Sequence, residues 1–351
     1  MVVIRKEAIF MAKDIKIGLI ARADKTGLGV QSWELYRHIS FDKVLIVDLE
    51  ELNSYPSDYS LYLTKNCEIC KGIPTDDQIN RFLSDLKAVF TIETPYNYYL
   101  YQEAKKRGIK TILQANYEFF DYLSDENLPP PDIVAVPTFW HFNKMKEVCK
   151  KIKSQLIYLP VPIAVERFKF KKRNKIEKIL HIAGTQAIND RNGTNLLLES
   201  LKDIKIPVII KTIKPLTKVI NSNKVIIDDV PKKYYWENYS EGDLFVLPRR
   251  YGGLCLPLNE ALASGMVPLM LDISPVNRIL PKECLVPAYK MFKFRVRDEI
   301  TCYSADPKLI SYYVKNLIEF DLSVINSWIK NYLFENSWQK LKPLYLKILC
   351  G

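Results

Sequence analysis

Short apolar runs alternate with amphipathic segments along the whole chain. Continuous apolar runs bounded by turns, with helices between them, indicate a parallel sheet covered on both faces. In the first half we expect strands at Lys16–Ala21, Val44–Leu49, Ala88–Ile92, Thr111–Gln114, Ile133–Val136 and Leu156–Leu159. The helices expected between them include Gln31–His38, Asp77–Leu86 and Tyr98–Arg107.

The second half repeats this scheme. Its expected strands are Ile179–Ala183, Val208–Lys211, Val225–Ile227, Leu244–Leu247, Val267–Leu271 and Cys284–Val286. Its expected helices are Thr194–Leu201, Asn259–Ser264, Lys308–Ile318 and a long aromatic-rich one at about Val324–Leu349. The repeated alternation predicts an α/β protein built from two doubly wound, Rossmann-like domains with an interdomain cleft.

The domain boundary is expected in the charged segment Glu166–Lys178, which lacks a buried pattern. We therefore expect a first domain over residues 14–168, a second over 176–323, and a C-terminal helix over 324–351 that packs back toward the first. Ligands of such sheets bind beyond the carboxyl ends of the strands, so the residues that follow each strand are the candidates for function.

Composition narrows the class of protein. Apolar residues make up 48% and charged residues 26% of the chain, as in ordinary globular domains. No apolar run approaches the ~20 residues that cross a bilayer, and charges interrupt the N-terminal stretch, so we expect no signal peptide there. We expect a cytoplasmic protein. The formal net charge of +11 favours phosphate-rich partners, although AT-rich coding alone produces such a lysine bias.

Three loops follow strands and lead into helices. The first contains Gly27, Leu28 and Gly29, and the second runs from Gly184 and Thr185 to Arg191 and Gly193. Glycines let backbone N–H groups approach a phosphate, and a helix N-terminus adds positive potential. A cation such as Arg191 is unfavourable at a helix start, and an anion bound between it and the amides would resolve the conflict.

The third loop follows the strand that ends at Leu247. It carries Arg249 and Arg250, which could neutralise phosphate, and then the turn Gly252-Gly253-Leu254-Cys255. Glu260 is expected in the first turn of the following helix, where it could accept hydrogen bonds from ribose hydroxyls. The alternative for Glu260 is a favourable helix-start charge without a ligand.

The segment around this third loop resembles the donor-binding half of family 4 retaining glycosyltransferases of the GT-B fold. Those enzymes show a Pro-Ser-Arg-Tyr-Glu-Gly-like turn, a Glu-Ala-x-Ala-x-Gly helix and a strand that ends in Asp. This chain supplies, in register, Pro248, Arg250, Tyr251, Gly253, Pro257, Glu260, Ala261, Ala263, Gly265 and Asp272. The resemblance extends over nearly the whole chain. The compact chain is also similar to stand-alone transferases encoded by phages and other viruses.

The resemblance implies a role for each matching position. Glu260 would hold the ribose, the residues Gly253, Leu254 and Cys255 would offer amides to the diphosphate or sugar, and Arg191 would bind the departing diphosphate. Asn192 stands where a lysine is usual, and Lys211 could compensate as a further catalytic cation. The donor would be a nucleotide diphosphate-sugar, most naturally a UDP-sugar, with no metal and no other cofactor.

Two departures from the pattern affect sugar and acceptor recognition. Gly252 replaces a glutamate that contacts the donor sugar in the family, which suggests an atypical donor such as a pentose. The histidine that many relatives carry after the fourth strand is missing as well. Catalytic or acceptor-steering carboxylates are then expected at Glu93 and Glu118, with the acceptor bound by Asn116, Tyr96 and His141. His181, inside a strand, is expected in the core.

The acceptor is left open between two classes. Lysine clusters at 144–153, 169–178 and 202–218, together with Tyr96, Tyr98, Tyr99 and Tyr101, suit DNA with a hydroxymethylated pyrimidine flipped out of the helix. The alternatives are a protein or surface-glycan acceptor, or a catalytically weak nucleotide-sugar-binding protein. A phosphorylase or isomerase on the same fold is a further class.

Overall fold

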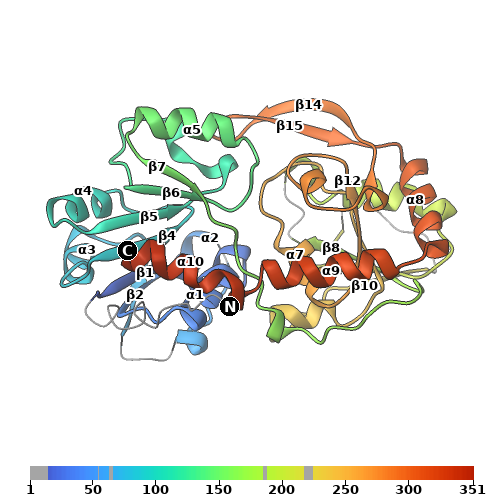
Figure 1. The fold of residues 1–351 in the computed structure, drawn as a ribbon, viewed down its shortest axis with the longest axis horizontal. Helices are drawn as coiled ribbons and strands as arrows, with labels where there is room; N and C mark the ends of the chain where they lie inside the picture. Colours follow the sequence, from blue (N-terminus) through green and yellow to red (C-terminus); the bar gives the residue numbers. More distant parts are fainter. Residues whose placement is uncertain (1–14, 54, 63–65, 185–187, 217–223) are drawn as a thin grey trace, which may run out of the picture. The chain divides into compact units, whose positions relative to one another are not determined.

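The chain folds into two compact units, which are described separately (Figure 1). The computed structural model describes residues 15–53, 55–62, 66–184, 188–216 and 224–351. Unit 1 contains the described residues as far as Pro137, together with His141–Pro160 and Leu341–Gly351. Unit 2 contains Thr138–Trp140 and Val161–Lys340.

Unit 1 is built on a parallel sheet of seven strands in the order β3-β2-β1-β4-β5-β6-β7. The order reverses between β1 and β4, so the carboxyl ends of these two strands frame the switch point where doubly wound folds bind ligands. The strands are β1 Ile17–Arg22, β2 Lys43–Asp48, β3 Cys67–Lys71, β4 Ala88–Ile92, β5 Lys110–Gln114, β6 Ile133–Val136 and β7 Gln155–Tyr158. The six strands expected from the apolar runs are confirmed.

Strand β3 was not predicted. It lies at the edge of the sheet, and within it only Cys70 is buried. An edge strand has one paired side and faces water over much of its surface, so it needs no continuous apolar run. Cys67 and Cys70 form a Cys-x-x-Cys pair on this strand, and side chains three residues apart along a strand point to opposite faces.

Five helices of unit 1 connect its strands: α1 Gly27–His38, α2 Glu50–Asn53, α3 Asp76–Phe82, α4 Tyr99–Lys106 and α5 Phe142–Lys151. The C-terminal helix α10, Trp338–Cys350, also contributes to this unit from Leu341 onward. Its Tyr345 ring lies 6.0 Å from that of Phe90 on β4, and its hydroxyl donates to the carbonyl of Pro160 at 3.1 Å. The aromatic content of this helix therefore serves packing.

Unit 2 has a parallel sheet of six strands in the order β10-β9-β8-β11-β12-β13. The strands are β8 Ile179–Gly184, β9 Val208–Thr212, β10 Val225–Asp228, β11 Leu244–Leu247, β12 Val267–Leu271 and β13 Leu285–Val286. The helices are α6 Thr194–Ser200, α7 Leu256–Ala263, α8 Pro307–Glu319 and α9 Ser323–Glu335. The neighbouring strands β8 and β11 place the loops that follow them side by side.

Two features of unit 2 differ from the prediction. A hairpin of β14 Tyr289–Arg295 and β15 Glu299–Ser304 (Figure 1) was missed. Every β14 residue except Phe294 is exposed, and β15 alternates buried and less buried residues, so neither strand is a continuous apolar run. The single helix expected at Val324–Leu349 is wrong: it is two helices, α9 and α10, that break at Asn336 and Ser337. The Asn336 carbonyl there accepts a hydrogen bond from the Ile163 N–H, so the break is used in packing.

No helix among the described residues combines the length and the apolar character needed to cross a membrane.

Candidate functional site

The loops after β8 and β11 are joined by several contacts. The Arg250 N–H donates to the carbonyl of Arg191 at 2.8 Å, and the Tyr251 hydroxyl donates to the carbonyl of Ile188 at 2.6 Å. The guanidinium of Arg191 lies over the Tyr251 ring, 5.4 Å from its centroid. Two loops that the sequence separates by some sixty residues therefore form one surface at the carboxyl ends of neighbouring strands.

The turn after β11 offers a row of unpaired amides. Among the described residues, the backbone N–H groups of Gly252, Gly253, Leu254 and Cys255 donate to no acceptor. Gly252, Gly253 and Cys255 are buried, and Leu254 is half-buried. Buried N–H groups in native proteins are almost always paired, so such a row at the start of α7 is suited to an external acceptor such as a phosphate.

Arg249 holds the shape of this turn. Its Nε donates to the carbonyl of Tyr251 at 3.0 Å, and its Nη1 donates to the carbonyl of Leu254 at 2.7 Å. The carbonyl groups on one side of the turn are therefore used by Arg249, while the N–H groups remain available. The side chain is buried, at 7% exposure.

The start of helix α6 is already occupied, which corrects one prediction. The Asp190 carboxylate accepts hydrogen bonds from the Asn195 N–H at 3.1 and 3.2 Å, and also from the N–H groups of Thr194 and Leu196. Burial raises the pKa of Asp190, against the effect of these N–H groups and of Arg250. Asp190 thus satisfies the helix start, and no bound anion is needed between its amides and Arg191.

Helix α7 begins earlier than predicted, which changes the place of Glu260. The helix starts at Leu256 and carries Pro257 in its first turn, where the missing N–H costs nothing. Glu260 therefore lies in the second turn, and the expectation of a first-turn carboxylate is wrong. The Glu260 carboxylate accepts a hydrogen bond from the buried Tyr239 hydroxyl, and burial followed by this carboxylate raises the pKa of Tyr239 well above its ordinary value.

Two further predicted cations are paired with carboxylates. Lys211 forms an ion pair with Asp228 on the neighbouring strand, and this hydrogen bond is the main cause that lowers the pKa of Asp228. Arg250 lies 3.7 Å from Asp190 and donates through Nε to the carbonyl of Tyr303 on β15. The roles expected for both cations at a diphosphate remain predictions.

Three other predicted positions lie around these loops. Gly184 ends β8 with a φ of +63°. Thr185 lies outside the described residues. Asn192, which stands at the usual lysine position, donates from its side chain to the carbonyl of Ile182 at 3.0 Å and so closes the loop onto β8.

His181 is a core residue, as expected. It is fully buried, and its ring nitrogens contact the Val246 carbonyl and the Thr194 hydroxyl, each at 2.8 Å. Because a carbonyl only accepts, Nδ1 carries the proton and Nε2 accepts from Thr194. Burial lowers the pKa of His181 to about 4. The neutral ring ties the start of α6 to β11 and so fixes the two loops.

We expect the stability of the protein to fall on acidification because of His181. The unfolded imidazole binds a proton below about pH 6.5, whereas the folded one does so only below about pH 4, so the unfolded state binds more protons between these values. The stabilising contribution of the neutral His181 is fully present above about pH 6.5 and is lost as the pH falls toward about 4. In His181→Asn, which keeps a donor for the Val246 carbonyl, chemical denaturation at pH 7 and 5 should show about 2 kcal/mol less pH-dependent loss than in the wild type. Equal losses in both proteins would contradict this.

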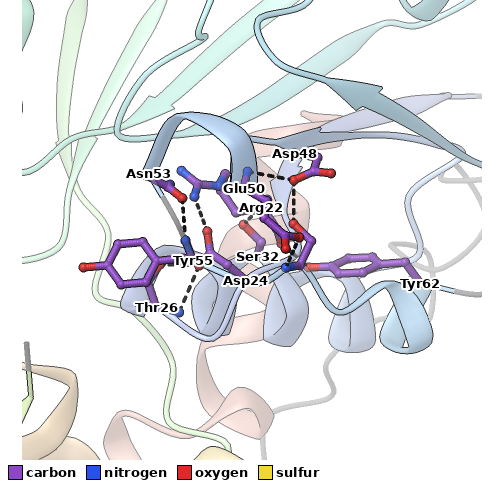
Figure 2. Close-up of polar contacts among 10 residues, drawn as sticks. Arg22, Asp24, Thr26, Ser32, Asp48, Glu50, Asn53, Tyr55 and Tyr62 are labelled. Carbon is purple, nitrogen blue, oxygen red and sulfur yellow. Dashed lines mark hydrogen bonds and ion pairs between the residues drawn. The ribbon is translucent and has the colours of Figure 1, made fainter. Parts of the chain in front are cut away.

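The glycine loop of unit 1 is built around Asp24 (Figure 2). The Asp24 carboxylate pairs with Arg22 at the end of β1 and accepts from the Thr26 N–H at 2.9 Å. A side chain at Gly29 would overlap the Asp24 carbonyl, so only glycine fits there. The N–H groups of Gly27, Leu28 and Gly29 open helix α1 and donate to no acceptor in the described chain. This loop therefore also presents amides to a ligand.

The predicted acceptor residues include several with unusual backbone angles. Glu93, Tyr96 and His141 have φ values of +68°, +64° and +51°, which non-glycine residues adopt infrequently. Asn116 donates to the Glu93 carboxylate at 3.2 Å, which brings two of these residues together. Tyr96 hydrogen-bonds to Arg22, and burial raises the pKa of Tyr96 to about 12. Such backbone conformations often accompany functional sites.

His141 and Glu118 are near enough to interact electrostatically. The His141 ring is stacked on Tyr117 at 4.0 Å between centroids. Loss of hydration, followed by the nearby Lys144, lowers the pKa of His141, while Glu118 opposes this shift. Glu118 is buried, at 3% exposure.

The tyrosines after β4 do not form one aromatic surface. Tyr101 is buried and its hydroxyl lies 2.6 Å from that of Thr91. The Tyr98 hydroxyl donates to Asp121 at 2.6 Å, and the Tyr98 ring meets that of Tyr101 edge to face. A nucleobase cannot stack on Tyr101, which removes one of the aromatic side chains proposed for DNA.

Sequence reasoning missed Asp190, Arg22 and Tyr239. Each acts on another residue of the site: Asp190 on the start of α6, Arg22 on Asp24, and Tyr239 on Glu260. The residue immediately before α6 is Gly193, so the usual cap signal does not identify Asp190, which lies four residues before the helix. The contact between Tyr239 and Glu260 joins two separate segments of the chain and has no local sequence pattern. Arg22 and Asp24 are only two residues apart, but their pairing depends on side-chain direction.

Comparison with known proteins identifies the fold. No protein-family signature and no curated protein sequence matches the chain. Among solved structures, a glycosyltransferase from Rickettsia africae is similar, with 11% identity, a TM-score of 0.62, and coverage of 96% of this chain and 99% of that one.

Two similar structures contain nucleotides or nucleotide sugars. An Anabaena protein in complex with UDP and glucose has 8% identity, a TM-score of 0.64, and coverage of 95% of this chain and 99% of that one. A trehalose-6-phosphate protein from E. coli bound with UDP-2-fluoro glucose has 10% identity, a TM-score of 0.59, and the same coverage. The chain therefore has the GT-B fold of glycosyltransferases, with one parallel α/β sheet in each unit.

Proposed function

We propose that the protein is a retaining glycosyltransferase that moves a sugar from a nucleotide diphosphate-sugar, a UDP-sugar by preference, to a hydroxyl group. The observation that carries the proposal is the row of unpaired amides at residues 252–255. This row lies on the surface formed with Arg191, so it offers an anion several fixed donors and one cation. A diphosphate is the natural occupant of such a site.

The same donors would lower the barrier of the transfer. As the sugar–oxygen bond breaks, negative charge grows on the diphosphate, and groups already aimed at that charge stabilise it without reorganisation. The leaving oxygen, held in this way, takes the proton of the acceptor hydroxyl on the same face of the sugar. This route gives retention and needs no protein base, and Glu93 is assigned the task of steering the acceptor hydroxyl.

Glu260 is assigned to the ribose of the donor. One of its interactions is the hydrogen bond from Tyr239, which fixes the carboxylate on α7. A carboxylate only accepts hydrogen bonds, and the two ribose hydroxyls are donors that it can take. The glycine loop of unit 1, with its open amides at 27–29, is assigned to the donor as well.

We propose a hydroxymethylated pyrimidine in DNA as the acceptor. Helix α5 and the turn after it carry the exposed lysines Lys144, Lys146, Lys150, Lys151 and Lys153, which suit a phosphate backbone. The aromatic contribution is smaller than the sequence suggested, since Tyr101 is buried. A protein or surface glycan is the competing acceptor.

The proposal is tested by incubating the protein with a panel of nucleotide sugars and either plain or hydroxymethylated DNA, with mass spectrometry as the readout. We expect a mass increase of one sugar on hydroxymethylated DNA only. Transfer to water or to a glycan, without a shift on DNA, would retain the transferase and remove the DNA acceptor. Nucleotide-sugar binding without transfer or hydrolysis would instead indicate a binding protein.

A further inference from the structure

The backbone of the turn at Gly252 is surrounded by positive charge. Gly252 has a φ of +118°, and a Cβ atom placed on it would lie less than 3.0 Å from Nη2 of Arg249 and from Nη2 of Arg191. Two guanidinium groups therefore approach the same point. These guanidinium groups fill the space that the replacement of the family glutamate by Gly252 would otherwise leave. This argues against a pentose donor, which was expected because that replacement removes bulk.

Arg249 is a buried cation without a counter-charge in the described chain. It is 7% exposed, its hydrogen bonds go to two backbone carbonyls, and it forms no ion pair with a carboxylate of the described residues. Carbonyl groups accept from two of its five N–H donors and leave its charge uncompensated. Burying a charge is costly unless an opposite charge pairs with it, so this arrangement favours an anionic ligand beside Gly252.

At this point the chain presents hydrogen-bond donors, whereas the family turn that the sequence resembles presents hydrogen-bond acceptors. There, a serine and a glutamate stand where this chain has Arg249 and Gly252, and the glutamate accepts hydrogen bonds from sugar hydroxyls. A guanidinium only donates. It pairs with an anion such as a carboxylate or a phosphate, through charge-assisted hydrogen bonds, and not with a neutral sugar hydroxyl.

We infer that the donor sugar carries a carboxylate, as in a hexuronic acid, and that Arg249 with Arg191 selects it. The inference rests on the proposed function, because it places the sugar of a nucleotide sugar next to the 252–255 amides. The diphosphate is the competing partner for Arg249, since it would bind to the same turn. A loss of affinity in an Arg249 variant that is larger for UDP-glucuronic acid than for UDP and UDP-glucose would assign Arg249 to the sugar carboxylate and not to the diphosphate.

The test is isothermal titration calorimetry of the full chain with UDP, UDP-glucose and UDP-glucuronic acid at one ionic strength. We expect UDP-glucuronic acid to bind at least tenfold more tightly than UDP-glucose. In Arg249→Met, which keeps the length of the side chain and removes its charge, this ratio should fall below about threefold, even where the altered turn weakens the binding of UDP itself. Arg81→Met, at an exposed arginine of unit 1, should leave the ratio unchanged.

Equal or tighter binding of UDP-glucose by the wild type overturns the inference, and this comparison needs no variant. An Arg249→Met protein that loses UDP, UDP-glucose and UDP-glucuronic acid by one common factor also overturns it, and assigns Arg249 to the diphosphate or to the shape of the turn. If Arg249→Met does not fold, Arg249→Lys replaces it, and it should keep the preference for the uronic acid. A wild-type protein that binds none of UDP, UDP-glucose and UDP-glucuronic acid contradicts the proposed UDP-sugar transferase itself.

Discussion

Replacing Arg191 with alanine is expected to lower kcat/KM for sugar transfer about a hundredfold, the usual cost of removing one donor that stabilises developing charge. The Arg191 side chain is held over the Tyr251 ring and beside Gly252, so its guanidinium lies at the row of open amides. The loss should appear mainly in kcat, because the charge on the diphosphate grows as the bond to the sugar breaks.

The matched control is Lys202→Ala, at an exposed lysine beyond the other end of helix α6, and it should retain wild-type activity. Arg191→Lys should recover part of the lost rate, since it restores a charge without the planar fork of donors. Thermal unfolding of each variant separates a lost donor from a lost fold. Turnover within threefold of the wild type in a folded Arg191→Ala protein would remove Arg191 from the reaction.

The sequence predicts best those parts of the fold that are buried on both sides. The central strands β4, β6, β11 and β12 occur at the predicted residues, because a strand covered on both faces must be a continuous apolar run. The edge strand β3 and the hairpin β14–β15 escape this reasoning. Most residues of β3 and β14 are exposed or half-buried, so burial does not produce a continuous apolar run there. Strand β15 instead alternates buried residues with less buried ones, a period-2 pattern that a search for continuous apolar runs does not find.

The candidate site shows a similar division. The loops after β8 and β11 could be found from glycines that follow strands, and the structure joins them. What the sequence could not show is which charges are already used. Asp190 accepts hydrogen bonds at the start of α6 from a loop in which Asn189 and Asp190 both have left-handed backbone angles. A hydrophobic pattern does not predict this loop conformation.

Arg249 illustrates the same limit at a single residue. In the sequence it stands beside Arg250 as one of two equivalent phosphate-binding candidates. In the fold, Arg250 pairs with Asp190, whereas Arg249 is directed to the backbone of the turn and has no carboxylate partner among the described residues. Which of two neighbouring arginines keeps its charge available depends on side-chain direction, and only three-dimensional packing decides that.

Replacing Glu260 with alanine is expected to weaken binding of the donor at least tenfold, a loss of about 1.4 kcal/mol. The ribose belongs to the nucleotide, so UDP alone should lose affinity by the same factor as the UDP-sugar. This equality is the signature of a ribose contact, because a carboxylate that contacted the sugar would leave UDP binding unchanged. Calorimetry with both ligands measures it without any acceptor.

The hydrogen bond between Tyr239 and Glu260 requires its own control, since Glu260→Ala leaves a buried hydroxyl without this acceptor. An unsatisfied buried group costs about 1–3 kcal/mol of stability, which could be mistaken for a binding defect. Tyr239→Phe removes the same hydrogen bond but keeps the carboxylate, so it should bind UDP within about threefold of the wild type. If Tyr239→Phe loses as much UDP affinity as Glu260→Ala, the carboxylate acts by supporting η8 (Tyr235–Tyr239) and not by holding the ribose.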